Sequence, residues 1–168
     1  MSGYHLEKLR ILVVDDNVHM RKLVITILQA LGAIHLLEAE SGEKAWAVLA
    51  AQNPDVVILD WVMEDMSGLA LARTIRTDPK APNPYVPVIM LTGHTQTARV
   101  REARDAGINE FIAKPVSLKT LMSRLAAVID NPRPYVRTRA YLGPCRRRRN
   151  LDYEGPERRA TGTIQAAE

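Results

Sequence analysis

The stretch ILVVDDN, residues 11–17, joins a short apolar run to two adjacent carboxylates. An apolar run rich in branched side chains that stops abruptly at charged residues is typical of a buried strand ending at the edge of a sheet. Asp15 and Asp16 repel each other, and a carboxylate is costly to bury unless a partner compensates its charge. The stretch therefore predicts a core strand and, at its carboxyl end, a site that neutralises two negative charges.

The same pattern of strand and helix recurs along the chain outward from this stretch. Segments with helical spacing of apolar residues separate the apolar runs, and a capping residue precedes most of them. Strands joined by single helices indicate an α/β domain with a parallel sheet and right-handed crossovers. The expected strands are 10–14, 34–39, 55–60, 88–91 and 108–113, and the expected helix caps are Asn17, Ser41, Ser67 and Ser117, with a polar helix at 95–106.

Polar side chains follow the predicted carboxyl ends of four strands. Sites in open parallel sheets form outside these ends, at the switch point of strand order. Carboxylates suit Mg²⁺, while an ammonium and a hydroxyl can hold phosphoryl oxygens, and a carboxylate can itself accept a phosphoryl group. The residues expected to converge are Asp15, Asp16, Asp60, Thr92 and Lys114.

With these residues at the ends of its predicted strands, the chain resembles the receiver domain of two-component response regulators. The resemblance covers about residues 8–130 and implies a flavodoxin-like (βα)5 fold, with a five-stranded parallel sheet in the order 2-1-3-4-5. An irregular C-terminal tail would follow this receiver domain. The motifs that carry the resemblance are VVDDN at 13–17, VVILDW at 56–61, DMSG at 65–68, MLTG at 90–93 and FIAKP at 111–115.

The resemblance also implies a phosphorylation site with a bound metal ion. Asp60 would be the phosphoacceptor. Mg²⁺ would be held by Asp15, Asp16 and Asp60, with the backbone carbonyl of Val62 as a further ligand. The peptide bond between Lys114 and the following proline would be cis.

Two further residues would form a switch in a protein with this resemblance. Thr92 would supply a hydroxyl that approaches the phosphoryl group, and Phe111 would be a mobile aromatic side chain three residues before Lys114. Their movement would reshape the surface of the fourth helix, the fifth strand and the fifth helix. The implied partners are a sensor histidine kinase or phosphotransfer protein and a downstream protein target, contacted through the receiver face or the tail.

A phosphohydrolase with an aspartyl-phosphate intermediate is the competing enzyme class. Such an enzyme needs a second carboxylate, two residues after the nucleophile, as general acid and base. Val62 stands at that position and cannot serve. We therefore expect a phosphoprotein of signal transduction, and not an enzyme.

Composition sets the broad class of the protein. The chain has 168 residues, of which 46% are hydrophobic and 25% charged, as in an ordinary globular domain. No run approaches the roughly 18 apolar residues of a membrane span, and the single cysteine excludes an internal disulfide. These features predict a cytoplasmic protein without a membrane partner.

The net positive charge of the protein comes entirely from its C-terminal part. Residues 1–129 contain 14 basic and 14 acidic residues, whereas residues 130–168 contain nine arginines and five acidic residues. The second part shows little apolar periodicity and has too few large side chains to form a second core. We therefore expect residues 131–168 to be an Arg-rich C-terminal extension with little regular structure.

The extension contains a repeat, YLGPCRR at 141–147 and YEGPERR at 153–159, in which five of seven positions match. One interpretation is an arginine-rich tail in which the repeat arose by chance. Another is a duplicated docking motif, with a Gly-Pro turn that presents Tyr and Arg to a protein partner or to the receiver's own surface. A third is a nucleic-acid-binding regulator that acts through the Arg and Tyr side chains. We favour a protein surface, because the interspersed Asp152, Glu154 and Glu157 weaken a continuous field for phosphates.

Overall fold

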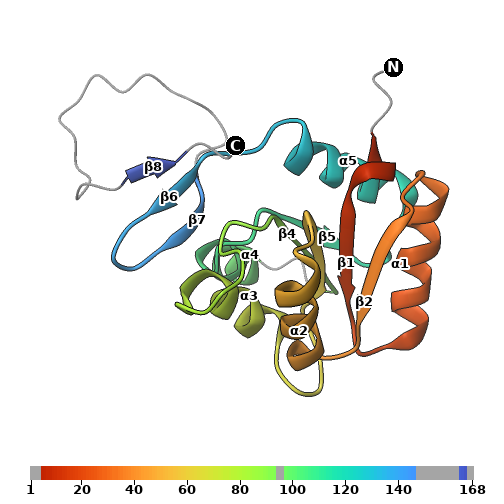
Figure 1. Ribbon diagram of the computed structural model, residues 1–168, viewed down its shortest axis with the longest axis horizontal. Helices are drawn as coiled ribbons and strands as arrows, with labels where there is room; N and C mark the ends of the chain where they lie inside the picture. Colours follow the sequence, from red (N-terminus) through yellow and green to blue (C-terminus); the bar gives the residue numbers. More distant parts are fainter. Residues whose placement is uncertain (1–4, 94–96, 147–162, 166–168) are drawn as a thin grey trace.

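A computed structural model describes residues 5–93, 97–146 and 163–165 of the chain. Its main feature is a parallel sheet of five strands in the order β2-β1-β3-β4-β5, with a helix between each pair of consecutive strands (Figure 1). The predicted fold class and strand order are confirmed. The strands are β1 (Arg10–Val14), β2 (His35–Ala39), β3 (Val56–Asp60), β4 (Val88–Thr92) and β5 (Glu110–Ala113).

The helices begin where the capping residues predict. The side chains of Asn17, Ser41, Ser67 and Ser117 each accept a hydrogen bond from a backbone N–H in the first turn that follows. Among the described residues, no helix is both long and apolar enough to cross a membrane. The helices are α1 (Val18–Ala30), α2 (Gly42–Gln52), α3 (Gly68–Thr77), α4 (Thr97–Asp105) and α5 (Leu118–Ile129), with a short 3-10 helix at Leu6–Lys8.

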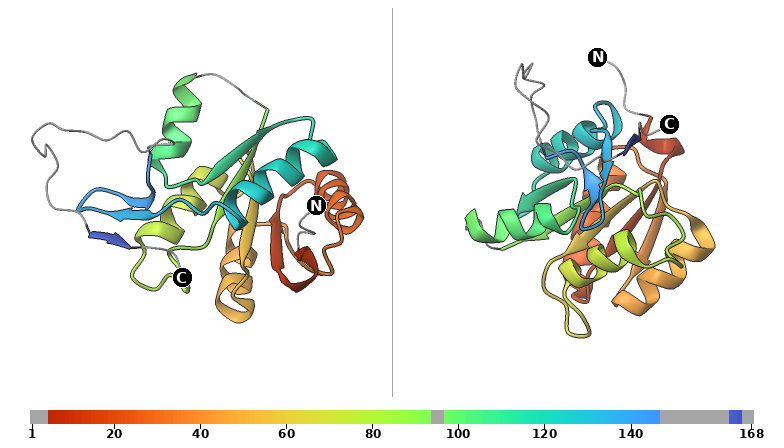
Figure 2. Two further views of the ribbon diagram at one scale, coloured as in Figure 1. Left: turned by 90° about the horizontal axis from the view of Figure 1, so that it is seen from above. Right: turned by 90° about the vertical axis from the view of Figure 1, so that its left-hand side faces the viewer.

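The central strands are apolar apart from their terminal residues because helices cover both faces of the sheet (Figure 2). Along β1, Leu12 and Val14 pack into the core layer that contains residues of α2, α3 and α4. Ile11 and Val13 alternate with them and pack against residues of α1 and α5. All four side chains are fully buried. The charged residues that end these strands are thereby held at the rim of a rigid core.

The extension is more ordered than its composition predicts. Tyr135–Arg137 (β6), Leu142–Pro144 (β7) and Thr163–Gln165 (β8) form an antiparallel sheet in the order β7-β6-β8. Each of these strands has three residues, so the regular structure described in the extension is short. Gly143 and Pro144 lie within β7, and not in the predicted turn. The second repeat copy lies outside the described residues.

The extension is ordered because it packs on the receiver body. Tyr135 and Leu142 are buried, and Gly143 lies so near Gly107 that a Cβ at either position would clash with the other segment. These contacts hold the extension on the body through apolar packing that the spacing of apolar residues in the sequence does not reveal.

A buried arginine joins the extension to the body. The Arg76 side chain of α3 donates hydrogen bonds to the carbonyl oxygens of Gly107 (3.1 and 3.0 Å) and Pro84 (2.7 Å) and to Asn109 Oδ1 (3.1 Å). The Tyr135 hydroxyl lies 3.5 Å from Arg76 and accepts a hydrogen bond from Asn109 Nδ2 (3.0 Å). A buried cation is tolerated only when its donors are satisfied, so this network fixes the extension against α3 and the start of β5.

Candidate functional site

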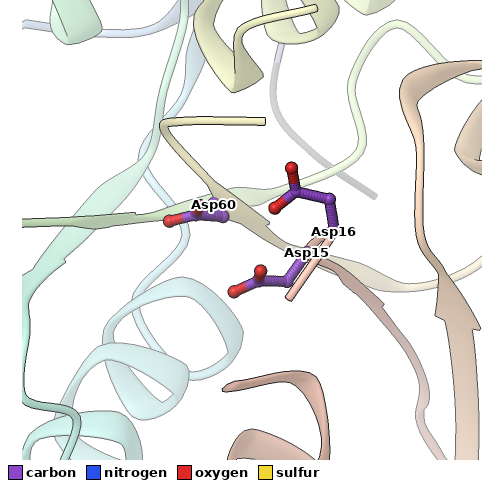
Figure 3. Close-up of side chains that lie close together, drawn as sticks. All are labelled: Asp15, Asp16 and Asp60. Carbon is purple, nitrogen blue, oxygen red and sulfur yellow. The ribbon is translucent and has the colours of Figure 1, made fainter. Parts of the chain in front are cut away.

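Three aspartates meet at the carboxyl edge of the sheet, as predicted. Asp15 and Asp16 directly follow β1, and Asp60 ends the neighbouring strand β3. One carboxylate oxygen from each of the three lies within 4.8 Å of the others (Figure 3). Since β1 and β3 are adjacent and parallel, the convergence follows directly from the strand order.

Asp15 is the most deeply buried member of this cluster, with 1% of its surface exposed. Its Oδ1 accepts a hydrogen bond from the Asn17 N–H (2.8 Å), whereas its buried Oδ2 accepts none from the described residues. Burial raises the pKa of Asp15; the Asn17 hydrogen bond opposes this rise, and the charge of Asp60 adds to it. A buried carboxylate oxygen without a donor indicates a place for a cation.

The remaining cluster geometry also suits a hard divalent cation. The half-exposed Asp16 accepts a hydrogen bond through Oδ2 from the Glu64 N–H (2.8 Å), which ties the loop after β3 to the acidic pair. Val62 lies in that loop with 63% of its surface exposed, two residues after Asp60. Mg²⁺ is held by one or two carboxylates together with water, so the three aspartates fit this ion.

Lys114 supplies the positive charge beside the cluster. Its Nζ lies 2.6 Å from Asp60 Oδ1, and its backbone N–H donates to the Thr92 carbonyl oxygen (2.8 Å). The Lys114–Pro115 peptide bond is cis, as predicted. Lys114 is thus held immediately after β5, within contact distance of the carboxylate that ends β3.

The two predicted switch residues lie on β4 and β5, the two strands that follow β3 in the sheet. Thr92 ends β4 and is 3% exposed, and β4 pairs directly with β3. Phe111 lies on β5, half-buried, and packs against the core layer of α2, α3 and α4. The structure therefore places Thr92 beside the strand that carries Asp60, and Phe111 one strand further along the sheet.

Gly68 shows how tightly the loop after β3 folds back on its strand. A Cβ at this position would lie 1.9 Å from the Asp60 carbonyl oxygen, and the Gly68 N–H donates to the Trp61 carbonyl (2.9 Å). Only glycine allows this approach, which explains the residue at the start of α3.

Two arginines that support the site escaped prediction. Arg21 of α1 donates to the Asp15 carbonyl oxygen (2.7 Å) and forms an ion pair with Glu38 (2.9 Å), so it anchors the β1–α1 loop. The Arg99 guanidinium lies 5.7 Å from the ring centre of Trp61, the residue after Asp60. Isolated helical arginines belong to no motif, and only their spatial position reveals them.

Comparison with known proteins supports the reading of this geometry. A family model that describes the response regulator receiver domain matches residues 11–126. The chain is 38% identical over 122 residues to the chemotaxis protein CheY1 of Helicobacter pylori, a match that covers 72% of this chain and 97% of that protein. It is 31% identical over 122 residues to the chemotaxis protein CheY of Pseudomonas aeruginosa, covering 73% and 97% of the two chains.

A solved structure gives the same result at the level of the fold. The chemotaxis protein CheY4 of Vibrio cholerae superposes with a TM-score of 0.66 at 28% identity, covering 72% of this chain and 98% of that one. The family match ends at residue 126, before the extension begins.

Proposed function

This chain belongs to the receiver-domain family of response regulators, and we propose that it is a phosphoacceptor whose Asp60 takes a phosphoryl group from a sensor histidine kinase or a phosphotransfer protein. The observation that carries this proposal is the contact between Lys114 and Asp60 within a cluster of three carboxylates. No structural role requires three carboxylates at one strand edge, because their mutual repulsion and burial cost stability.

The chemistry follows from the position of Asp60. A carboxylate oxygen of Asp60 attacks the phosphorus of the donor, a new O–P bond forms, and the bond to the donor's leaving group breaks. Lys114 holds positive charge beside the reacting carboxylate, where it compensates the charge of the phosphoryl oxygens. Positioning and charge neutralisation are the main requirements of phosphoryl transfer.

Asp15, Asp16, Asp60 and the Val62 carbonyl would hold Mg²⁺, which when bound neutralises phosphoryl oxygens. Asp15 suits this role because its buried Oδ2 has no hydrogen-bond partner among the described residues. Arg21 keeps the loop that carries Asp15 in place through the Asp15 carbonyl.

Thr92 and Phe111 would change position when Asp60 is phosphorylated. The Thr92 hydroxyl would donate a hydrogen bond to the phosphoryl group, a contact available only in the phosphorylated state. Phe111 would turn inward, and because it has no hydroxyl its burial leaves no polar group unsatisfied. The surface of α4, β5 and α5 would change, and a protein target would sense that change.

We further propose that the chain relays the phosphoryl group and does not act as a hydrolytic enzyme. The residue two places after Asp60 is the apolar, exposed Val62, which cannot act as a general acid or base. Nucleic-acid binding through the extension stays an alternative prediction.

Intact-mass measurement after treatment with acetyl phosphate and Mg²⁺ tests the phosphoacceptor role. Wild type should gain the mass of one phosphoryl group, and Asp60→Asn should gain none. Asp55→Asn is the matched control, because Asp55 lies just before the other end of β3, where its carboxylate accepts a hydrogen bond from the Arg10 N–H (2.8 Å). Full modification of Asp60→Asn, or of wild type in excess chelator, would refute the proposal.

A further inference from the structure

The loop between β3 and α3 carries part of the proposed metal site. Val62, whose carbonyl oxygen would bind Mg²⁺, lies in this loop two residues after Asp60. Backbone hydrogen bonds fix both ends of the loop, from the Trp61 N–H to the Leu91 carbonyl oxygen (3.0 Å) and from the Gly68 N–H to the Trp61 carbonyl oxygen (2.9 Å). The position of the Val62 carbonyl therefore depends on what holds the residues between these two ends.

One hydrogen bond to the middle of the loop comes from the acidic pair. The Glu64 N–H donates to Asp16 Oδ2 (2.8 Å). Asp16 is also a proposed metal ligand, so a bound cation would attract the same carboxylate that holds the loop. A support that keeps its geometry with and without the cation has to come from outside the cluster.

The start of α2 supplies such a support through the side chain of Asp65. Asp65 Oδ2 accepts a hydrogen bond from the N–H of Gly42, the first residue of α2 (2.8 Å; Figure 1). The helix already has a local cap, because Ser41 Oγ accepts a hydrogen bond from the Lys44 N–H (3.1 Å). Asp65 lies 23 residues further along the chain than Gly42, so its contact joins two separate elements.

The chemistry of this contact favours a carboxylate. The first N–H groups of a helix have no acceptor within the helix and carry partial positive charge, so an anionic acceptor binds them well. Hydrogen bonds to ionised acceptors are stronger than those between neutral groups. Asp65 therefore holds the loop more firmly than a neutral side chain would.

Close packing accompanies the hydrogen bond. A Cβ on the buried Gly42 would lie 2.5 Å from Met66 Sδ and 3.3 Å from Asp65 Oδ2. Two consecutive residues of the loop thus lie directly against the start of α2. Met63 also packs into the core layer, but its flexible thioether can adapt to several backbone positions. The hydrogen bonds at Glu64 and Asp65 define the backbone more narrowly.

We propose that Asp65 is a positioning residue of the phosphoacceptor site, which holds the β3–α3 loop on α2 and thereby keeps the Val62 carbonyl in place for the cation. The inference rests on the proposed function, because it concerns the same metal site. Coupling between two sites is reciprocal. Binding of the cation and order at the Gly42 N–H should therefore reinforce each other.

Titration of the full chain with MgCl₂, followed in ¹⁵N–¹H NMR spectra, tests the proposal. Wild type should show saturable shifts at the amides of Asp16 and Val62. Asp65→Ala should raise the Kd for Mg²⁺ about three- to fivefold, as expected for the loss of one hydrogen bond. Asp65→Asn keeps an acceptor oxygen for the Gly42 N–H, so its Kd should stay within about twofold of wild type.

Two control variants separate this contact from other effects. Ser41→Ala removes the local cap of α2 but leaves Asp65 in place, so it should lower stability without changing the Kd. Glu64→Ala removes an exposed carboxylate from the same loop but keeps the backbone hydrogen bond to Asp16. Its Kd should change less than that of Asp65→Ala, because only a screened surface charge is lost.

The amide of Gly42 gives a readout that needs no metal ion. In Asp65→Ala without Mg²⁺, this amide proton should move upfield and exchange with solvent about tenfold faster than in wild type. Asp65→Asn should restore most of the protection. Ser41→Ala should instead speed the exchange of the Lys44 amide, which it leaves without its acceptor.

Several results would overturn the proposal: an unchanged Kd in Asp65→Ala, a loss of equal size in either control variant, or no recovery in Asp65→Asn. A wild-type chain without any response to Mg²⁺ would refute both the proposal and the metal part of the proposed function. The mass test on Asp60 is independent of these titrations. The expected Kd values in a chain that takes no phosphoryl group would refute the phosphoacceptor role and leave the role of Asp65 intact.

Discussion

At the scale of single residues, the negative charge of Asp15 favours the binding of a cation but lowers the stability of the folded protein. Its carboxylate is buried, its Oδ2 has no donor among the described residues, and Asp60 and Asp16 add repulsion. A buried charge without compensation destabilises the folded state. The cost is tolerated where the same group serves a bound cation.

Replacing Asp15 with asparagine should therefore stabilise the metal-free protein while weakening its response to Mg²⁺. The free energy of unfolding in chelator at pH 7 should rise by about 1 kcal/mol or more, because the variant removes the desolvated charge. Urea unfolding with and without Mg²⁺ measures both effects. The metal ion should stabilise wild type more strongly than Asp15→Asn.

The pH dependence gives an independent check on Asp15→Asn. Because folding raises the pKa of Asp15, the wild-type carboxylate costs stability above that raised value, where it is ionised in both states. Below the ordinary aspartate pKa of about 3.9 it is protonated in both states and the cost disappears. The advantage of the variant should therefore shrink as pH falls; an advantage that grows on acidification would contradict this account.

At the scale of structural elements, the β6–β7 pair is held by one hydroxyl group as well as by apolar packing. The Tyr135 hydroxyl accepts from Asn109 Nδ2 (3.0 Å) and lies beside the buried Arg76 guanidinium. Asn109 Oδ1 in turn accepts a hydrogen bond from the Val88 N–H (2.9 Å). The network thus connects the extension to the starts of β4 and β5.

Tyr135→Phe should lower the free energy of unfolding by about 1–3 kcal/mol, because it leaves a buried Asn109 donor without its acceptor. Thermal or urea unfolding measures the loss. Tyr141→Phe is the matched control: its hydroxyl donates to the Pro144 carbonyl and contacts Arg146, both within the extension, so its removal should cost less. Equal losses in the two variants would show that the Arg76–Asn109 network contributes nothing specific.

Most elements of the receiver body were predictable because their signals are local. Alternating apolar and polar segments revealed the strands, and Asn17, Ser41, Ser67 and Ser117 are helix caps both in the sequence and in the structure. Parallel strand order then placed Asp15, Asp16 and Asp60 together. The strand pattern predicted that these residues share one edge of the sheet, and the family resemblance supplied the strand order that makes β1 and β3 neighbours.

The order of the extension could not be predicted in this way. β6 and β7 contain three residues each, too few for a periodic pattern. Their stabilising contacts are distant in the chain, since Tyr135 lies 59 residues from Arg76 and 26 from Asn109. The role of Arg21, which anchors the loop that carries Asp15, was not predicted for the same reason. That role depends on a tertiary contact.

At the scale of the whole molecule, the phosphoacceptor edge and the extension lie at opposite ends of the sheet. Asp60 stands at the carboxyl end of β3, whereas the extension contacts Gly107 and Asn109 at the amino end of β5. Since the strands are parallel, these ends are separated by the length of the strands. Phosphorylation of Asp60 and docking of the extension should therefore be separable.

A chain shortened to residues 1–131 should still fold and accept a phosphoryl group, but with reduced stability. The solved CheY4 structure is matched over 98% of its chain by 72% of this one, so a receiver domain does not need the additional residues. The truncation exposes the surface that Tyr135 and Leu142 cover, and should lower the free energy of unfolding by about 2–4 kcal/mol. Part of the loss is offset because Arg76 regains contact with water.

Thermal unfolding and acetyl-phosphate labelling of the shortened chain measure the two properties separately. Asp60 should be modified to the same final extent as in the full chain, at a temperature where both are folded. The control is the full chain with Tyr135→Phe, which keeps the extension but lacks its buried hydroxyl and should show an intermediate stability. Loss of phosphorylation in a folded truncated chain would mean that the extension acts on the carboxyl edge across the sheet. The phosphoacceptor body would then not be independent of the extension.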